Sequence, residues 1–281
     1  MEKWQPYQER YPENTVIGDL RIWPACYSPQ LNNQRAIYAW LPPGYHDTKQ
    51  RYPVLYMHDG DNLFDARRSY SGEWLVDETM QQLSQQGQPA IIIGLSNQGN
   101  LRRMEYNPYA SQWPEIPDGS GENYIRFLVE TLKPFIDASF RTLPDRQHTG
   151  IAGSSMGGLI SLYGFLTRPE VFGFCGALST AYWFGKEGLL NTIETCASGV
   201  GKVYLDVGTE EGPTLQGWGY ADQDLDRAYV TGVRRLHEAL LEHGYDQANL
   251  MYLEETGAPH HESAWARRLP AALKFLLPKS V

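Results

Sequence analysis

Hydrophobic residues in this chain gather in short unbroken runs, which alternate with longer stretches where they recur every three or four positions. Unbroken runs are typical of strands covered on both faces of a sheet, and the wider spacing is typical of amphipathic helices. The runs predict strands within residues 35–43, 52–60, 89–97, 148–153, 172–180, 202–209 and 248–255. The spaced patterns predict helices within residues 73–87, 121–140, 157–169, 224–244 and 262–278, the second containing Pro134.

This alternation predicts one α/β domain over residues 1–281, with a mostly parallel central sheet and helices on both faces. In such sheets the loops after the carboxyl ends of the strands carry the functional residues. Two connections, 97–121 and 210–223, are longer than ordinary loops and contain Tyr and Trp. We therefore expect both loops to line an active site.

Composition excludes several classes of protein. The net charge of −9 offers no basic surface for nucleic acid or an anionic membrane. The chain has neither a long apolar run nor an apolar leader, so we expect no membrane span and no secretory signal. Cys26, Cys175 and Cys196 form no CxxC and no disulfide pattern. These features predict a reduced, cytoplasmic protein.

The turn between the strand at 148–153 and the helix at 157–169 contains G-x-S-x-G, as Gly153-Ser154-Ser155-Met156-Gly157. A serine at the centre of a sharp strand-to-helix turn is a candidate nucleophile, because the flanking glycines leave room around it. The register selects Ser155, since Ser154 has no glycine two residues before it. The helix N-terminus at this point also favours developing negative charge.

A nucleophilic serine needs a base, which in an α/β-hydrolase comes last in the chain order Ser, acid, His. His237 and His243 belong to the amphipathic helix and are expected to face solvent. His260 and His261 lie between the last strand and the last helix, where the base belongs. Either is a candidate base, and the alternative is a surface turn that caps the next helix.

The acid that orients the base is expected after the strand at 202–209. The acidic residues in and after this strand are Asp206, Glu210, Glu211, Asp222 and Asp224. Asp206 falls within the strand, whereas Glu210 and Glu211 fall at its carboxyl edge. Spacing alone does not choose among these acids.

An oxyanion hole needs two backbone N–H groups. Met156, directly after the nucleophile, supplies one, and Asp61 in the loop at 56–65 is the candidate for the other. The acids Asp59, Asp61 and Asp65 of that loop also suggest a metal, but they lack the EF-hand pattern. We expect no metal and no other cofactor.

These segments resemble the putative-esterase family of α/β-hydrolases, which includes siderophore, feruloyl and acetyl-xylan esterases, esterase D-like enzymes and mycolyltransferases. The likeness runs from about residue 41 to the final helix. Its blocks are "RYPVLYMHDGDNLFD", "EWLVDET", "RRMEYNPY", "IAGSSMGG", "VYLDVGTEE" and "GAPHHESAW". The resemblance implies an α/β-hydrolase fold with Ser155 as nucleophile and the N–H groups of Met156 and Asp61 as oxyanion donors.

The same resemblance bears on the base and the acid. The family's motif G-A-x-H-N-E-x-x-W implies His260 as base, with His261 in the position of Asn. Its G-T-x-[DE] turn implies Glu211 as acid and leaves Glu210 as the alternative. Many relatives have Gln where this chain has Asp61, and an acid there is expected to alter the charge preference for substrate.

The sequence therefore predicts a serine carboxylesterase that acts on a small-molecule ester through an acyl-enzyme. The candidate substrate-binding residues are Tyr182, Trp183, Trp218, Tyr220, Arg103 and Tyr106. Core packing is the alternative for each aromatic residue. Arg103 is expected to bind a substrate carboxylate, or else to pair with Glu73 or Glu105.

Three other functions remain as alternatives. An acyltransferase would use the same catalytic residues, and a silent binding protein would keep only the fold. A nucleotide-binding fold would use the glycine-rich turn as a phosphate loop, with an acid at the end of the next strand. The strand at 172–180 ends in Ser-Thr instead, and no Walker Lys follows the turn, which argues against it. The acyl group, the alcohol and the oligomeric state are not specified by the sequence.

Overall fold

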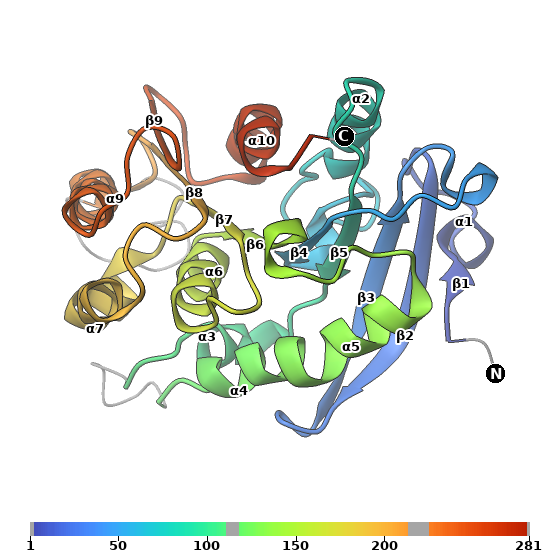
Figure 1. The fold of residues 1–281 in the computed structure, drawn as a ribbon, viewed down its shortest axis with the longest axis horizontal. Helices are drawn as coiled ribbons and strands as arrows, with labels where there is room; N and C mark the ends of the chain where they lie inside the picture. The colour runs from blue at the N-terminus through green and yellow to red at the C-terminus, as the bar shows by residue number, and fades with distance from the viewer. Residues whose placement is uncertain (1–2, 111–117, 213–224, 280–281) are drawn as a thin grey trace.

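The computed structural model describes residues 3–110, 118–212 and 225–279. These residues form a nine-stranded sheet in the order β1-β2-β3-β5-β4-β6-β7-β8-β9 (Figure 1). Strands β4 to β9 are parallel to one another, and β1, β2 and β3 add an antiparallel edge. The strands are β1 Gln5–Pro6, β2 Asp19–Ser28, β3 Asn33–Leu41, β4 Val54–His58, β5 Ile91–Leu95, β6 Thr149–Ser154, β7 Phe174–Leu178, β8 Lys202–Gly208 and β9 Leu250–Glu255. The predicted α/β fold with a mostly parallel sheet is confirmed.

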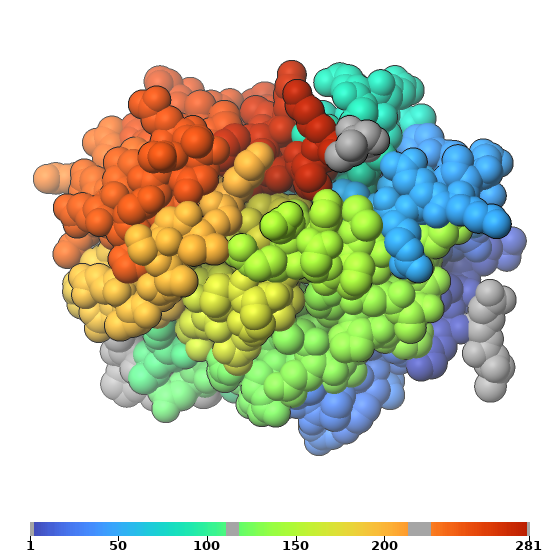
Figure 2. Space-filling model, in the orientation of Figure 1, coloured from blue at the N-terminus to red at the C-terminus, as the bar shows by residue number. Residues whose placement is uncertain are grey.

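Helices cover both faces of this sheet (Figure 1). One face carries α4 Gly121–Arg126, the π-helical turn η4 Phe127–Leu132, α5 Lys133–Ser139, α6 Met156–Thr167, α7 Tyr182–Thr195 and α9 Leu225–Glu242. The other face carries α2 Val76–Gln85 and α10 Glu262–Leu276, which lie side by side (Figure 2). The short helices are α1 Tyr7–Arg10, α3 Arg102–Glu105, η1 Tyr45–Asp47, η2 Gly60–Asn62, η3 Gly99–Leu101 and η5 Arg146–His148.

The two faces are built from alternate residues of each strand, as the period of a strand requires. In β4, Val54 and Tyr56 pack in the core beneath α6, whereas Leu55 and Met57 pack beneath α2 and α10. Every residue of β4 is buried. Burial on both faces explains why this strand reads as an unbroken apolar run.

Besides several elements of two to four residues, the sequence analysis missed β2 and α7, and it simplified the helix over 121–140. Strand β2 contains Pro24, which cannot donate to a neighbouring strand, and the pairing with β3 shifts register between Trp23 and Cys26. Helix α7 has a non-helical residue at Lys186 and was not predicted. The predicted helix over 121–140 contains the π-helical turn η4 directly before Pro134, whose missing N–H interrupts regular helical bonding.

Candidate active site

The residues predicted to be catalytic or to form the oxyanion hole follow the carboxyl ends of the parallel strands. Asp61 follows β4, Ser155 follows β6, Glu211 follows β8 and His260 follows β9. The strand register aligns these ends, because Ser154 pairs with Leu178 of β7, which in turn pairs with Asp206 of β8. The site therefore lies along one edge of the sheet, where the fold leaves loops free to vary.

Ser155 has the backbone geometry of a nucleophile elbow. Its φ of 58° and ψ of −121° are strained for a residue with a side chain. Three hydrogen bonds hold this conformation: the Ser155 amide donates to Leu178 O at 2.9 Å, and its carbonyl accepts from the Leu159 and Ala181 amides at 3.1 Å. Ser155 is partly exposed, whereas Ser154 is buried in β6. Of the two serines, Ser155 is thus the one whose side chain is accessible, and its role as nucleophile stays a prediction.

The glycines around Ser155 are required by close packing. A Cβ at Gly153 would lie 2.9 Å from Cδ2 of His58, and one at Gly158 would lie 2.9 Å from Oγ1 of Thr180, just after β7. Both distances are too short for a real side chain. The turn can therefore lie directly against β4 and β7 only because these positions have no side chain.

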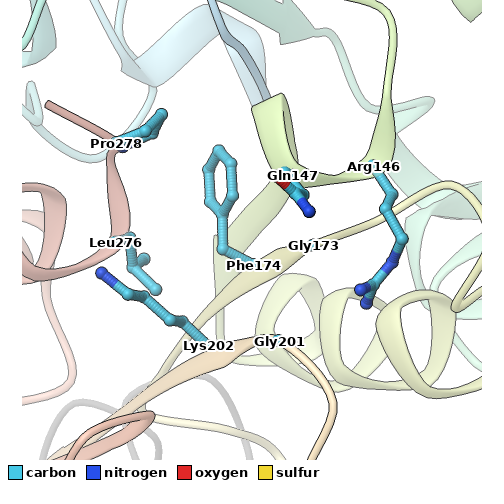
Figure 3. A pocket seen from close by; sticks show the side chains of 8 residues that line it. All are labelled: Arg146, Gln147, Gly173, Phe174, Gly201, Lys202, Leu276 and Pro278. Carbon is cyan, nitrogen blue, oxygen red and sulfur yellow. The ribbon is translucent and has the colours of Figure 1, made fainter. Parts of the chain in front are cut away.

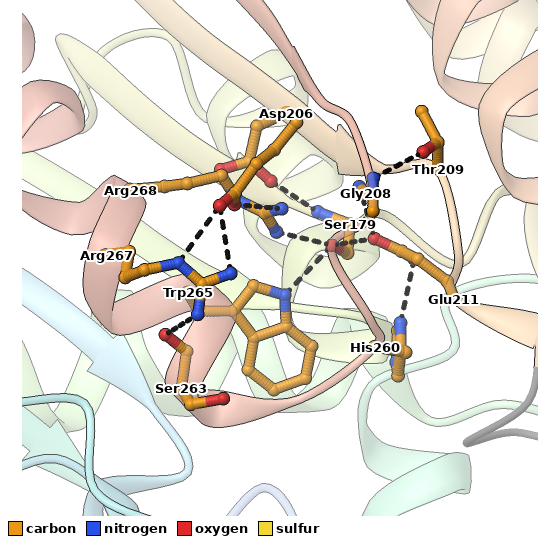
Figure 4. Close-up of polar contacts among 12 residues, drawn as sticks. Ser179, Asp206, Gly208, Thr209, Glu211, His260, Ser263, Trp265, Arg267 and Arg268 are labelled. Carbon is orange, nitrogen blue, oxygen red and sulfur yellow. Dashed lines mark hydrogen bonds and ion pairs between the residues drawn. The ribbon is translucent and has the colours of Figure 1, made fainter.

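His260 and Glu211 form a fully buried pair, with Nδ1 of the imidazole 2.9 Å from Oε2 of the carboxylate (Figure 4). The rings of Tyr229 and Trp265 pack against the imidazole, at centroid distances of 4.8 and 5.0 Å. A carboxylate can only accept, so the proton of a neutral His260 lies on Nδ1. Nε2 is then the atom with a lone pair, which is the tautomer that a general base requires.

The other candidate bases and acids have different surroundings. Nδ1 of His261 accepts from the Ser263 amide at 3.1 Å, so this residue caps α10. Glu210 is exposed. Asp206 is buried, its carboxylate 3.0 Å from Nε of Arg268, and burial raises its pKa to about 6 although Arg268 opposes the shift. Asp222 and Asp224 lie outside the described residues.

The other carboxylate oxygen of Glu211 is also occupied. Oε1 accepts from Ser179 Oγ at 2.5 Å and from the Gly208 amide at 2.6 Å (Figure 4). Ser179 directly follows β7, and its hydroxyl also accepts from Trp265 and Arg268. The sequence analysis missed Ser179, because no motif distinguishes a serine at the end of a strand.

The loop after β4 contains Asp61, the candidate donor of the second oxyanion N–H. A Cβ at Gly60 would lie 2.8 Å from the carbonyl carbon of Gly94, so the loop packs directly on β5. The Asp61 carboxylate accepts from Tyr38 Oη at 2.6 Å and Ser96 Oγ at 2.9 Å, which fixes its orientation. Met156 begins α6, so its amide is among the first four, which have no acceptor within the helix.

Arg102, which the sequence analysis did not single out, contacts this loop. Its guanidinium binds both carboxylate oxygens of Asp59 at 2.7 Å. Burial opposes ionisation of Asp59, but Arg102 outweighs it and lowers the pKa of the carboxyl. Arg103 is exposed, and its predicted partner Glu105 is bound by Arg35 instead. The alternative pairing of Arg103 with Glu105 is therefore not formed, and the expectation that Arg103 binds a substrate carboxylate stays a prediction.

The predicted substrate-binding aromatics divide into three groups. Tyr106 is fully buried between His58 and Tyr124, so it packs in the core and cannot line a pocket in this structure. Tyr182 is also buried. Trp183 is partly exposed and packs edge-on against Tyr229, the residue that contacts His260. Trp218 and Tyr220 lie outside the described residues.

Carboxylates able to bind a metal gather elsewhere. Among the described residues, Glu73, Asp77 and Glu78 each place an oxygen within 4.8 Å of the others, near the start of α2. The acids of the loop at 56–65 have separate partners, Arg102 for Asp59, Tyr38 for Asp61 and Tyr7 for Asp65.

A cavity of about 170 Å³ lies at the opposite edge of the sheet (Figure 3). It is lined by residues at or just before the starts of β6, β7 and β8 and at the end of α10, including Arg146, Phe174, Lys202 and Leu276. Its cations bind backbone carbonyls, Arg146 those of Pro169 and Phe172, and Lys202 that of Phe275. This cavity is therefore not part of the candidate active site.

The sheet order and the elbow define an α/β-hydrolase. The chain belongs to the family described as putative esterases, whose model matches residues 28–276. It is thus a hydrolase acting on carboxylic esters.

Among curated proteins, the uncharacterized protein YbbA of Bacillus subtilis is 27% identical over 86% of this chain and 92% of its own length. The apo-salmochelin esterase of Escherichia coli is 33% identical over 50% of this chain. The ferri-bacillibactin esterase BesA of Bacillus subtilis is 29% identical over 43%. The chain spans only 45% of the length of each of these two esterases.

Solved structures share the fold across almost the whole chain. The BES protein of Bacillus cereus has a TM-score of 0.71 and 21% identity, covering 94% of this chain and 96% of its own. The enterobactin esterase FES of Shigella flexneri has a TM-score of 0.67 and 18% identity, covering 93% of this chain and 59% of its own. In the described part of the chain, no helix combines the length and apolar character needed to cross a bilayer.

Proposed function

We propose that this esterase forms an acyl-enzyme on Ser155, with His260 as general base and Glu211 as the acid that orients it. The observation that carries the proposal is the buried His260–Glu211 pair at 2.9 Å, at the same sheet edge as the strained, partly exposed Ser155. A serine hydroxyl is a weak nucleophile at neutral pH and requires such a pair.

In the first half-reaction, Oγ of Ser155 attacks the ester carbonyl carbon while Nε2 of His260 takes its proton. The N–H groups of Met156 and Asp61 bind the oxyanion of the tetrahedral intermediate. The intermediate collapses as His260 returns the proton to the departing alcohol, which leaves the acyl group on Ser155. Water then releases the acid by the same steps, and Glu211 stabilises the imidazolium formed in each.

The relatives named as siderophore and feruloyl esterases suggest which substrates to test first. We propose a small-molecule ester of one of these classes. Trp183 is the described aromatic placed to contact it, because Trp183 packs on Tyr229 beside the base. A panel of catecholate-lactone, feruloyl, acetyl-sugar and p-nitrophenyl esters would rank the acyl and alcohol preferences.

The nucleophile is tested by comparing two adjacent serines. Ser155→Ala is expected to lower kcat/KM for a p-nitrophenyl ester about 10³-fold or more, because the acyl acceptor is lost. It should also abolish labelling by a fluorophosphonate probe. Ser154→Ala is the matched control, since Ser154 is buried in β6, and it should keep both activities within about threefold.

Mass spectrometry of the labelled protein identifies the modified residue. An adduct on another residue, or near-normal turnover by Ser155→Ala, would show that a different group attacks the ester.

A further inference from the structure

We propose that Ser179 is a positioning residue for ester hydrolysis, which orients the Glu211 carboxylate toward His260; this rests on the proposed function. Ser179 lies just after β7 and is fully buried. Its hydroxyl is 2.5 Å from Oε1 of Glu211. Nothing in the G-x-S-x-G or histidine motifs requires a serine here.

The direction of the Ser179 hydroxyl proton follows from its other partners. Oγ of Ser179 accepts from Nε1 of Trp265 at 2.9 Å and from Nη2 of Arg268 at 2.9 Å (Figure 4). Indole and guanidinium N–H groups can only donate, and a hydroxyl has one proton and two lone pairs. Both lone pairs are therefore occupied, and the proton of Ser179 must point to Glu211.

This bond decides which oxygen of Glu211 faces the base. The terminal torsion of a Glu side chain is broad, so hydrogen bonds must set the orientation of its carboxylate. Ser179 and the Gly208 amide both donate to Oε1, which leaves Oε2 for Nδ1 of His260. Without the Ser179 proton, a single donor would hold Oε1.

Ser179 is itself held by an ion pair. Its amide donates to Oδ1 of Asp206 at 3.0 Å, and Oδ2 of Asp206 lies 3.0 Å from Nε of Arg268. Arg268 thus contacts Asp206 through Nε and Ser179 through Nη2. These contacts hold Ser179 at a φ of 42°, in the left-handed region that glycine adopts more easily. A strained serine where glycine would fit better indicates that the hydroxyl is needed.

The test uses Ser179→Ala and Ser179→Gly, because the two variants separate positioning from stability. Both remove the hydroxyl, but glycine also relieves the backbone strain, so Ser179→Gly should have a Tm equal to or above that of Ser179→Ala. If Ser179 positions Glu211, both variants should lose kcat about 10- to 100-fold, with KM within about twofold of wild type. Ser28→Ala is the control, since Ser28 is a fully buried serine whose hydroxyl accepts from the Leu31 amide in the β2–β3 turn.

The His260–Glu211 bond also has a spectroscopic signature. Its bridging proton should give a downfield resonance in the proton NMR spectrum, assigned by its loss in His260→Ala. That resonance should shift or broaden in both Ser179 variants and stay unchanged in Ser28→Ala. Wild-type kcat in the Ser179 variants, or activity that returns in Ser179→Gly along with stability, would overturn the proposal.

Failure of the proposal is distinguishable from failure of the proposed function. If wild type is labelled at Ser155 and Ser155→Ala is inactive, but the Ser179 variants turn over at the wild-type rate, only the role of Ser179 is wrong. If Ser155→Ala stays active, the acyl-enzyme itself is wrong, whatever Ser179 does.

Discussion

At the scale of single residues, two pairs of sequence neighbours show how different the surroundings of adjacent, identical residues are. Ser154 completes strand β6 in the core, whereas Ser155 takes the strained conformation that presents it at the helix start. His260 is fully buried against Glu211, whereas the side chain of His261 caps α10. In both pairs the two residues are of the same type, so the course of the backbone decides which of the two side chains lies at the candidate site.

The histidine pair gives a prediction at this scale. His260→Ala should lower kcat/KM about 10³-fold or more, since no base remains for Ser155. His261→Ala should keep kcat/KM but lower the free energy of unfolding by about 1 kcal/mol, because an N-terminal cap of α10 is lost. Ester hydrolysis and urea unfolding of both variants check this, and a larger loss of activity in His261→Ala would exchange the two roles.

At the scale of elements, two helices begin directly after a residue with a left-handed backbone, which costs strain. Helix α6 begins directly after Ser155 at a positive φ. Helix α2 follows Leu75, which has a φ of 53° and no side-chain cap. Leu75 is exposed, so its side chain gains little from burial to offset the left-handed conformation.

Leu75→Gly should therefore stabilise the protein, by about 0.5–1 kcal/mol, because glycine adopts this conformation without strain. Leu101→Gly is the matched control, since Leu101 is equally exposed and precedes α3 with a φ of −81°. It should be neutral or destabilising, because glycine there only adds freedom to the unfolded chain. Thermal unfolding measures both variants, and a fall in Tm for Leu75→Gly would contradict the prediction.

At the scale of the whole molecule, side chains distant in sequence join the layers. The Ile17 amide donates to Oδ2 of Asp77 at 2.7 Å, which ties the N-terminal segment to the start of α2. Glu73 and Glu78 lie beside Asp77. Burial, together with neighbouring Glu78, raises the pKa of Asp77 to about 8, and burial raises that of Glu73 to about 7.

These raised pKa values predict how stability changes with pH. Between about pH 4 and pH 8 the folded protein keeps a proton on Asp77 that the unfolded chain has released. The free energy of unfolding should therefore fall as pH rises through this range. Asp77→Asn should flatten that decline and raise Tm at pH 8, because Asn stays neutral and its side-chain oxygen still accepts from Ile17.

The control for this prediction is Asp47→Asn, which changes an exposed acid in η1. Its Tm should follow the same pH dependence as wild type. A wild-type Tm that does not fall between pH 5 and pH 8, or an Asp77→Asn variant with the wild-type slope, would show that Asp77 is ionised throughout.

The local periodicity of hydrophobic residues predicted most of the strands and long helices of the fold. The buried strands and amphipathic helices were predicted within the right segments, since each pattern is a property of neighbouring residues. β2 was missed because Pro24 obscured its pattern, and α7 because its helical geometry breaks at Lys186. Among the predicted substrate-binding residues, Tyr106 is contradicted by its burial, which depends on how the segment after β5 packs against His58 and Tyr124.

The sequence by itself determined the chain order of the buried parallel strands and of the amphipathic helices, the glycine-flanked serine turn, and the segments expected to supply a base and an acid. Each of these features depends on residues that lie close together in the sequence. Only the tertiary structure decided that His260 meets Glu211, that Arg102 binds Asp59, and that Ser179 donates a hydrogen bond to Glu211. Ser179 lies 32 residues from Glu211 and 89 from Arg268 along the chain, so their contact exists only once β7, β8 and α10 have packed. Hydrogen bonds act over a few ångströms in space, and no local pattern records which distant side chains the fold brings together.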